Sequence, residues 1–92
     1  MTGKERVKLY LRAIRTFGAT MQITVAIEEM SELTKELCKA KRGIGNTDHV
    51  AEEIADTIIM LEQLQIIFDC NERVAEIKQR KLERLQGRME ES

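Results

Sequence analysis

The amino-acid sequence predicts an all-α protein built from four helices, on the strength of three observations. The 92 residues include no proline, and proline is the residue that interrupts helices most strongly. Apolar residues recur at the three- and four-residue spacing of one helical face in successive segments. Hydrophobic residues make up 42% of the chain and charged residues 34%, a balance that favours a helical, water-soluble domain.

The chain is short enough to form one domain with a small core. A domain of this size buries only about 60–65% of the surface that its unfolded chain exposes. We therefore expect residues 1–92 to form a single helical domain, with residues 89–92 as a disordered tail. The net charge of −1 is spread over mixed acids and bases, which predicts neither a nucleic-acid partner nor a membrane partner.

Cysteine usage and hydropathy together predict a cytoplasmic protein. Cys38 and Cys70 are too few for a disulfide framework and lack metal-ligand spacing, so we expect free thiols in a reducing compartment. The start of the chain, MTGKERVKLY, has no apolar stretch suited to a signal peptide. The most apolar segment, IADTIIMLEQLQIIF, contains Asp56 and Glu62 and is too short to span a bilayer.

The first two helices are expected over residues 4–14 and 20–40, separated at Gly18. The first presents one apolar face to its neighbours. The second has an apolar stripe at helical spacing. The members of that stripe are Ile23, Ile27, Met30, Leu33 and Leu37.

The last two helices are expected over residues 49–68 and 71–88. The segment KRGIGNTD before the third helix is a predicted loop, in which Asn46, Thr47 or Asp48 can cap that helix. Asp69 and Glu72 have the spacing of a capping box before the fourth helix.

The third helix differs from the others because apolar residues surround most of its circumference. Its sequence from residue 54 to residue 68 is IADTIIMLEQLQIIF. A helix that is apolar on all sides is a buried helix, and three short neighbours from the same chain cannot cover it. We therefore expect the bundle to be completed by homo-oligomerisation, as a dimer or a tetramer.

Two carboxylate clusters interrupt these apolar segments, EEMSE at residues 28–32 and EEIAD at residues 52–56. Each cluster contains two acids three residues apart, a spacing that places both side chains on one face of a helix. Uncompensated buried carboxylates change their pKa, find cations or bind metal. The paired acids are Glu29 with Glu32 and Glu53 with Asp56, and Glu28 and Glu52 precede them.

The chemistry of these acids predicts a hard metal ion. Oxygen-only ligands suit Mg²⁺, or alternatively Mn²⁺. A di-iron bundle requires Glu-x-x-His motifs, and the single histidine, His49, lies outside both clusters. The alternative is a charged bundle in which the acids pair with nearby cations. Those cations are Lys35, Lys39, Lys41 and Arg42.

The fourth helix carries cations on its apolar side. Lys78 and Lys81 project toward the side of the helix that carries Val74, Ile77 and Leu85. One interpretation is that their long stems lie against apolar neighbours while the charges reach water. The other is that Lys78, Lys81, Arg84 and Arg88 contact phosphates bridged to the metal.

The motif EExxE followed by ExxD resembles the signature of MazG-like nucleotide pyrophosphohydrolases. The resemblance extends through FGATMQITVAIEEMSELTKEL, HVAEEIADTIIMLEQL and KLERLQGRM, from about residue 17 to residue 89. It is to the short, single-domain members of phage and Bacillus type. It implies a MazG-like four-helix bundle that oligomerises and hydrolyses nucleoside triphosphates to monophosphate and pyrophosphate with Mg²⁺.

The resemblance also implies roles for particular residues. Glu29, Glu32, Glu53 and Asp56 become the metal ligands, and Lys81 and Arg84 become phosphate contacts. Some family members have consecutive arginines where Leu85 follows Arg84 here, so Lys78 and Arg88 are substitutes. Glu28 or Glu52 could orient the attacking water, and the sequence does not choose between them.

Two functions of different classes follow from the sequence. The first is a pyrophosphohydrolase that sanitises or regulates a nucleotide pool. The second is a catalytically silent bundle that serves as an oligomeric interaction or nucleotide-binding module. The four acids of the expected metal site are all present, which favours the enzyme.

Overall fold

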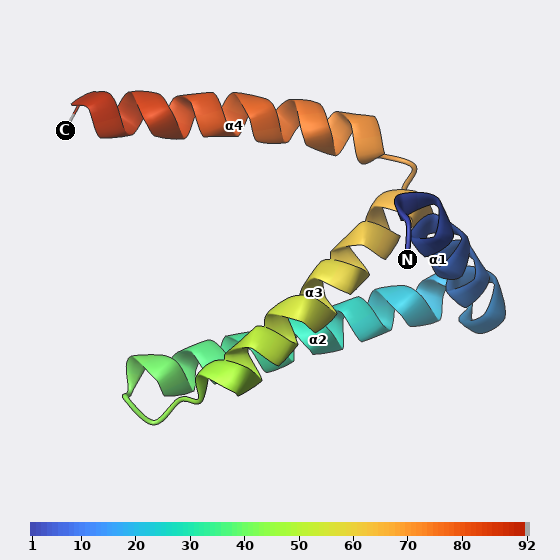
Figure 1. The fold of residues 1–92 in the computed structure, drawn as a ribbon, viewed down its shortest axis with the longest axis horizontal. Helices are drawn as coiled ribbons and strands as arrows, with labels where there is room; N and C mark the ends of the chain where they lie inside the picture. The colour runs from blue at the N-terminus through green and yellow to red at the C-terminus, as the bar shows by residue number, and fades with distance from the viewer. Residues whose placement is uncertain (92) are drawn as a thin grey trace.

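Residues 1–91, the part of the chain that the computed structural model describes, form four α-helices and no strand. The helices are α1 (Gly3–Phe17), α2 (Ala19–Lys41), α3 (Thr47–Ile67) and α4 (Asn71–Glu91) (Figure 1). The all-α prediction is confirmed. α4 continues through residues 89–91, where a disordered tail was predicted, and Ser92 lies outside the described residues.

The first helix begins at a side-chain cap and ends at a glycine. The Oγ1 atom of Thr2 accepts a hydrogen bond from the Glu5 backbone N–H at 3.1 Å. At the other end, Gly18 has φ 90° and ψ 147°, a backbone conformation that is nearly restricted to glycine. This single residue separates α1 from α2 and turns the chain between them.

The loop between α2 and α3 starts with a hydrogen-bonded glycine turn. Gly43 has φ 76° and donates its backbone N–H to the Ala40 carbonyl at 3.0 Å. Ile44 donates to the Lys39 carbonyl at 3.1 Å. This pair of bonds is the Schellman arrangement, which satisfies carbonyl groups at a helix C-terminus.

Asn46 closes the same loop by capping α3. Its Oδ1 atom accepts hydrogen bonds from the backbone N–H groups of Asp48 at 2.8 Å and His49 at 3.2 Å. Of the three candidate caps in the sequence, the structure therefore uses Asn46. Together the two caps make α2 and α3 an antiparallel hairpin, which is the most extensive helix pair in the chain (Figure 1).

The core within one chain is small and partly polar. Its buried apolar residues are Tyr10, Ala26 and Met60. Between α2 and α3, the buried side chains of Gln22 and Gln63 hydrogen-bond to each other at 2.8 Å. Because buried amides must find partners, this pair fixes how the two helices align along their length.

The face by which α2 meets α3 is not its apolar stripe. Ala26 and Glu36 are buried, whereas Ile27 and Leu37 of the predicted stripe are 56% and 47% exposed. The predicted stripe is therefore only partly covered within residues 1–91, because Ile23 and Leu33 are half-buried whereas Ile27, Met30 and Leu37 are exposed. The hairpin instead encloses a polar face and leaves much apolar surface outside.

The turn between α3 and α4 ends one helix rather than capping the next. Asp69 has φ 48°, and its backbone N–H donates to the Ile66 carbonyl at 3.1 Å. Cys70 donates to the Gln65 carbonyl at 2.9 Å, again in the Schellman arrangement. The predicted capping box is therefore wrong, because Asp69 terminates α3 and Cys70 directly precedes α4.

α4 leaves the other three helices instead of closing a bundle. Its contact with the rest of residues 1–91 is limited to α3, and it runs away from that junction as a separate arm (Figure 1). None of its residues is buried. Across the described residues, no helix combines the length and apolar character that crossing a bilayer requires.

Candidate metal centre

The α2–α3 hairpin brings acids of the two sequence clusters together. One carboxylate oxygen from each of Glu29, Glu53 and Asp56 lies within 4.8 Å of the other two. The Thr57 hydroxyl, next to Asp56, donates to the Glu29 carbonyl at 3.5 Å. This contact and the helix spacing place Glu29 opposite the ExxD pair of α3.

Glu53 has an unpaired oxygen inside this cluster. Its Oε2 atom is buried and has no hydrogen-bond partner. A buried carboxylate oxygen without a partner is costly. The charged-bundle alternative requires nearby cations to pair with these acids. Within residues 1–91, Lys39 pairs instead with Glu36 and Arg6 with Glu62.

The surroundings raise the pKa of two acids in the cluster. Burial raises the pKa of Glu29 above its ordinary value, and the charges of Asp56 and Glu53 raise it further. Burial likewise raises the pKa of Glu53, with contributions from Asp56, Glu32 and Glu52. The cluster therefore favours taking up a positive species, either a proton or a metal ion.

Three of the four predicted metal ligands come together in one chain. Glu32 is exposed and lies outside the group of oxygens within 4.8 Å. It follows Glu29 by three residues, on the same side of α2, and its charge raises the pKa of Glu53. A change of rotamer could bring a side chain of this length toward a metal ion.

The two candidates for orienting water flank the cluster at its surface. Glu28 and Glu52 are both exposed. Glu28 directly precedes Glu29, and Glu52 directly precedes Glu53. The charge of Glu52 raises the pKa of Glu53.

The predicted phosphate contacts lie on α4, away from the acids. Lys78, Lys81, Arg84 and Arg88 line one surface of that helix. The structure thus gathers these four cations with each other. α4 makes no helix contact with α2 within the described residues, so one chain does not join the cations to the carboxylates.

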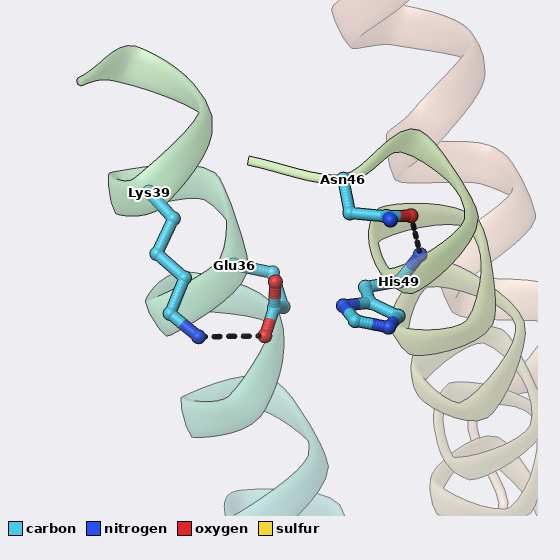
Figure 2. Close-up of polar contacts among 4 residues, drawn as sticks. All are labelled: Glu36, Lys39, Asn46 and His49. Atoms are coloured by element: carbon cyan, nitrogen blue, oxygen red, sulfur yellow. Dashed lines mark hydrogen bonds and ion pairs between the residues drawn. The ribbon is translucent and has the colours of Figure 1, made fainter. Parts of the chain in front are cut away.

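Glu36 is a buried acid that the sequence analysis did not select. It is 9% exposed, its Oε1 atom lies 3.5 Å from Lys39 Nζ, and its Oε2 atom has no hydrogen-bond partner. Figure 2 shows it on α2, with His49 facing it from the start of α3. The signal was its position seven residues after Glu29, which puts both on the same helical face.

The ligand set fits a small hard cation. Three carboxylate oxygens within 4.8 Å of one another, with an unpaired oxygen on Glu53, match the oxygen ligands of Mg²⁺ or Mn²⁺. Such a set leaves octahedral positions for water and for a ligand that brings its own oxygens. Phosphate oxygens are the usual ligands of this kind.

The chain matches no protein-family model, no curated protein and no solved structure. The MazG-like resemblance therefore stays a prediction that is based on the quoted motifs. The geometry of the carboxylate cluster stands independently of it.

Proposed function

We propose that the protein is a Mg²⁺-dependent nucleoside triphosphate pyrophosphohydrolase that acts as a homo-oligomer. The proposal is carried by one observation, the convergence of Glu29, Glu53 and Asp56, of which Glu53 has an unpaired buried oxygen. The EExxE and ExxD motifs, which contain these residues, support the nucleotide substrate by resemblance. Mn²⁺ is an alternative metal ion.

In this proposal Glu29, Glu53 and Asp56 would hold the metal ion, with Glu32 as a fourth ligand. The bound ion would supply positive charge that offsets the charge of the triphosphate. Fixed carboxylates on two hydrogen-bonded helices would align the substrate without reorganisation during the reaction.

The reaction is the attack of water on the α-phosphorus. Glu52 or Glu28 would orient the water and accept its proton as the new oxygen–phosphorus bond forms. The bond from the α-phosphorus to the bridging oxygen breaks, and pyrophosphate leaves with the electron pair of that bond. The cations Lys78, Lys81, Arg84 and Arg88 would contact the phosphates.

The exposed apolar surfaces support self-association, and the free thiols support a reducing compartment. Ile58 and Leu61 of α3 are 50% and 43% exposed, although the sequence of α3 is that of a buried helix. A second copy would cover such residues in a dimer or tetramer. Cys38 and Cys70 are free, which agrees with a reducing compartment such as the cytoplasm.

The test is incubation with a panel of canonical and modified nucleoside triphosphates plus Mg²⁺, with pyrophosphate and orthophosphate assayed separately. We expect pyrophosphate and nucleoside monophosphate in equal amounts, and no turnover in excess chelator. Nucleotide binding without turnover would instead support the silent binding module. Full turnover in chelator would exclude the metal mechanism.

A further inference from the structure

One chain exposes far more surface than a compact protein of its mass. A folded monomer of 10.6 kDa exposes about 5,500 Å², whereas this chain exposes 7410 Å². Its radius of gyration is 16.1 Å, compared with about 12 Å for a compact domain of this length. The extended α4 accounts for the shape (Figure 1).

One side of α4 exposes apolar residues. Leu82 and Leu85 are 49% and 47% exposed, and Val74 is 36% exposed. These residues line the same surface of α4 as Lys81 and Arg84. A helix with an apolar stripe is stable in proteins chiefly because that stripe is buried against another element. The rest of residues 1–91 leaves the stripe of α4 exposed.

Hydrogen bonds in the turn between α3 and α4 fix the direction of α4, and no flexible linker separates the two helices. Two backbone hydrogen bonds of the Schellman arrangement hold the turn, from Asp69 to Ile66 and from Cys70 to Gln65. α4 begins immediately afterwards, and the Val74 N–H donates to the Cys70 carbonyl at 2.9 Å. Folding α4 back over its own α2 would require breaking this turn. A second chain can be reached without breaking it.

Charge identifies which surface of a second chain α4 fits. The carboxylate cluster is an acidic site in which one oxygen from each of Glu29, Glu53 and Asp56 lies within 4.8 Å of the other two, and the buried Oε2 atom of Glu53 has no hydrogen-bond partner. The surface of α4 that carries Lys81 and Arg84 has the opposite sign. Apolar residues such as Ile54 and Ile58 of α3 are exposed on the hairpin. They offer an apolar surface against which the apolar side of α4 can pack.

We infer that α4 of a second copy of this chain docks on the α2–α3 hairpin and brings Lys81 and Arg84 to the carboxylate cluster of the first. In a two-fold dimer the exchange is reciprocal, so each site takes its acids from one chain and its cations from the other. This inference rests on the proposed function. It adds that the site is incomplete in a single chain.

The surface area agrees with such an exchange. Burying the excess of about 1,900 Å² per chain gives an interface of about 3,800 Å² in total. This lies within the range of about 2,000–5,000 Å² that is typical of obligate homodimers.

The test mixes two inactive variants. A Glu53→Gln chain lacks the acidic half of the site, and a Lys81→Met, Arg84→Met chain lacks the basic half. After co-refolding in equal amounts, half of the dimers are mixed, and each has one intact site if the halves come from different chains. We expect recovery of about a quarter of wild-type turnover.

The control mixes Glu53→Gln with Glu29→Gln, which both damage the acidic half. Every site then contains a damaged acidic half, so we expect no recovery. Wild-type turnover with no recovery in the first mixture would overturn the exchange of α4 and leave the proposed function standing. A wild-type protein without turnover would contradict the proposed function itself.

A second measurement does not depend on activity. Glu32→Cys and Arg84→Cys are placed in separate chains that also carry Cys38→Ser and Cys70→Ser, and the chains are mixed with a short bis-maleimide. We expect a covalent dimer linked between positions 32 and 84 of different chains, identified by mass spectrometry. A folded monomer, or a dimer without this cross-link, would overturn the inference. Binding of α4 to lipid vesicles in place of a second chain, tested by vesicle co-sedimentation, would also overturn it.

Discussion

At the residue scale, Glu53 connects the electrostatics of the site to its proposed chemistry. Its Oε2 atom is buried without a partner, and the neighbouring acids Asp56, Glu32 and Glu52 all raise its pKa. A surface glutamate would instead be solvated or paired with a lysine. The side chain is therefore suited to a cation and poorly suited to the metal-free protein.

The first prediction is that Glu53→Gln abolishes turnover while the metal-free protein stays folded. The amide removes one negative charge from a repelling cluster, so the melting temperature in chelator should hold or rise. Pyrophosphate release and thermal melting measure the two effects. Glu76→Gln on exposed α4 is the matched control, with near-normal turnover expected. Unfolding of Glu53→Gln would show that the carboxylate is structural.

The second prediction concerns pH and uses the raised pKa values of Glu29 and Glu53. The folded state binds these protons more tightly than the unfolded chain, whose ordinary pKa is 4.5. The free energy of unfolding of the metal-free protein should therefore fall as pH rises from 4.5 through the raised values.

Thermal melting in chelator, from pH 4.5 to about pH 8, measures this dependence. Glu53→Gln should show a shallower fall than wild type, because one of the shifted groups is gone. Mg²⁺ should restore stability at the upper end, since it binds the ionised acids. Identical pH profiles for wild type and variant would contradict the electrostatic account of the cluster.

At the element scale, helix positions were predictable from local chemistry, whereas helix partners were not. The absence of proline, Gly18 and the KRGIGNTD loop predicted four helices close to those observed. Periodicity did not predict which face of α2 meets α3, because Gln22 pairs with Gln63 and makes the contact face polar. It also could not give the direction of α4, which depends on the left-handed backbone of Asp69.

The same limits apply to the candidate site. Helical spacing alone placed Glu53 and Asp56 on one face, and the clusters on successive helices met as expected. Glu36 was overlooked because it belongs to no motif, and its spacing of seven residues from Glu29 indicates a shared helical face but not burial. Only packing shows that it is buried.

The third prediction tests the glycine between α1 and α2. Gly18→Ala should lower the free energy of unfolding by about 1–3 kcal/mol, because φ 90° strains any residue with a β-carbon. Space is not the cause, since no atom lies within 4 Å of the added carbon. Gly87→Ala, equally open but helical, should instead stabilise by about 0.5–1 kcal/mol. Chemical denaturation measures both, and equal effects would contradict the backbone explanation.

The fourth prediction concerns α4 and its cation Lys81. Lys81→Met keeps the aliphatic stem and deletes the charge, so thermal stability should hold or rise. Turnover should fall by about 10²-fold or more, the scale of losing one contact to a developing anion. Lys8→Met on exposed α1 controls for lost surface charge. Near-normal turnover of Lys81→Met would remove Lys81 from the site and direct attention to Arg84 and Lys78.

At the scale of the whole molecule, a small core and a large exposed apolar surface within residues 1–91 lead us to predict a second chain. Three buried apolar residues, Tyr10, Ala26 and Met60, give the single chain little hydrophobic stabilisation. The apolar circumference of α3 in the sequence is a further reason for this prediction. We therefore predict a dimer or larger species in sedimentation at micromolar concentration, and a well-folded monomer there would refute the burial argument.

The central claim is that carboxylates on α2 and α3 bind a divalent cation, and titration with paramagnetic Mn²⁺ tests it most directly. Amide signals in the NMR spectrum should broaden first near Glu29, Glu53 and Asp56, whose oxygens lie within 4.8 Å of one another. Excess Mg²⁺ should reverse the broadening, and Glu53→Gln should abolish it. Broadening that is uniform, centred on other acids, or unchanged in Glu53→Gln would contradict the account.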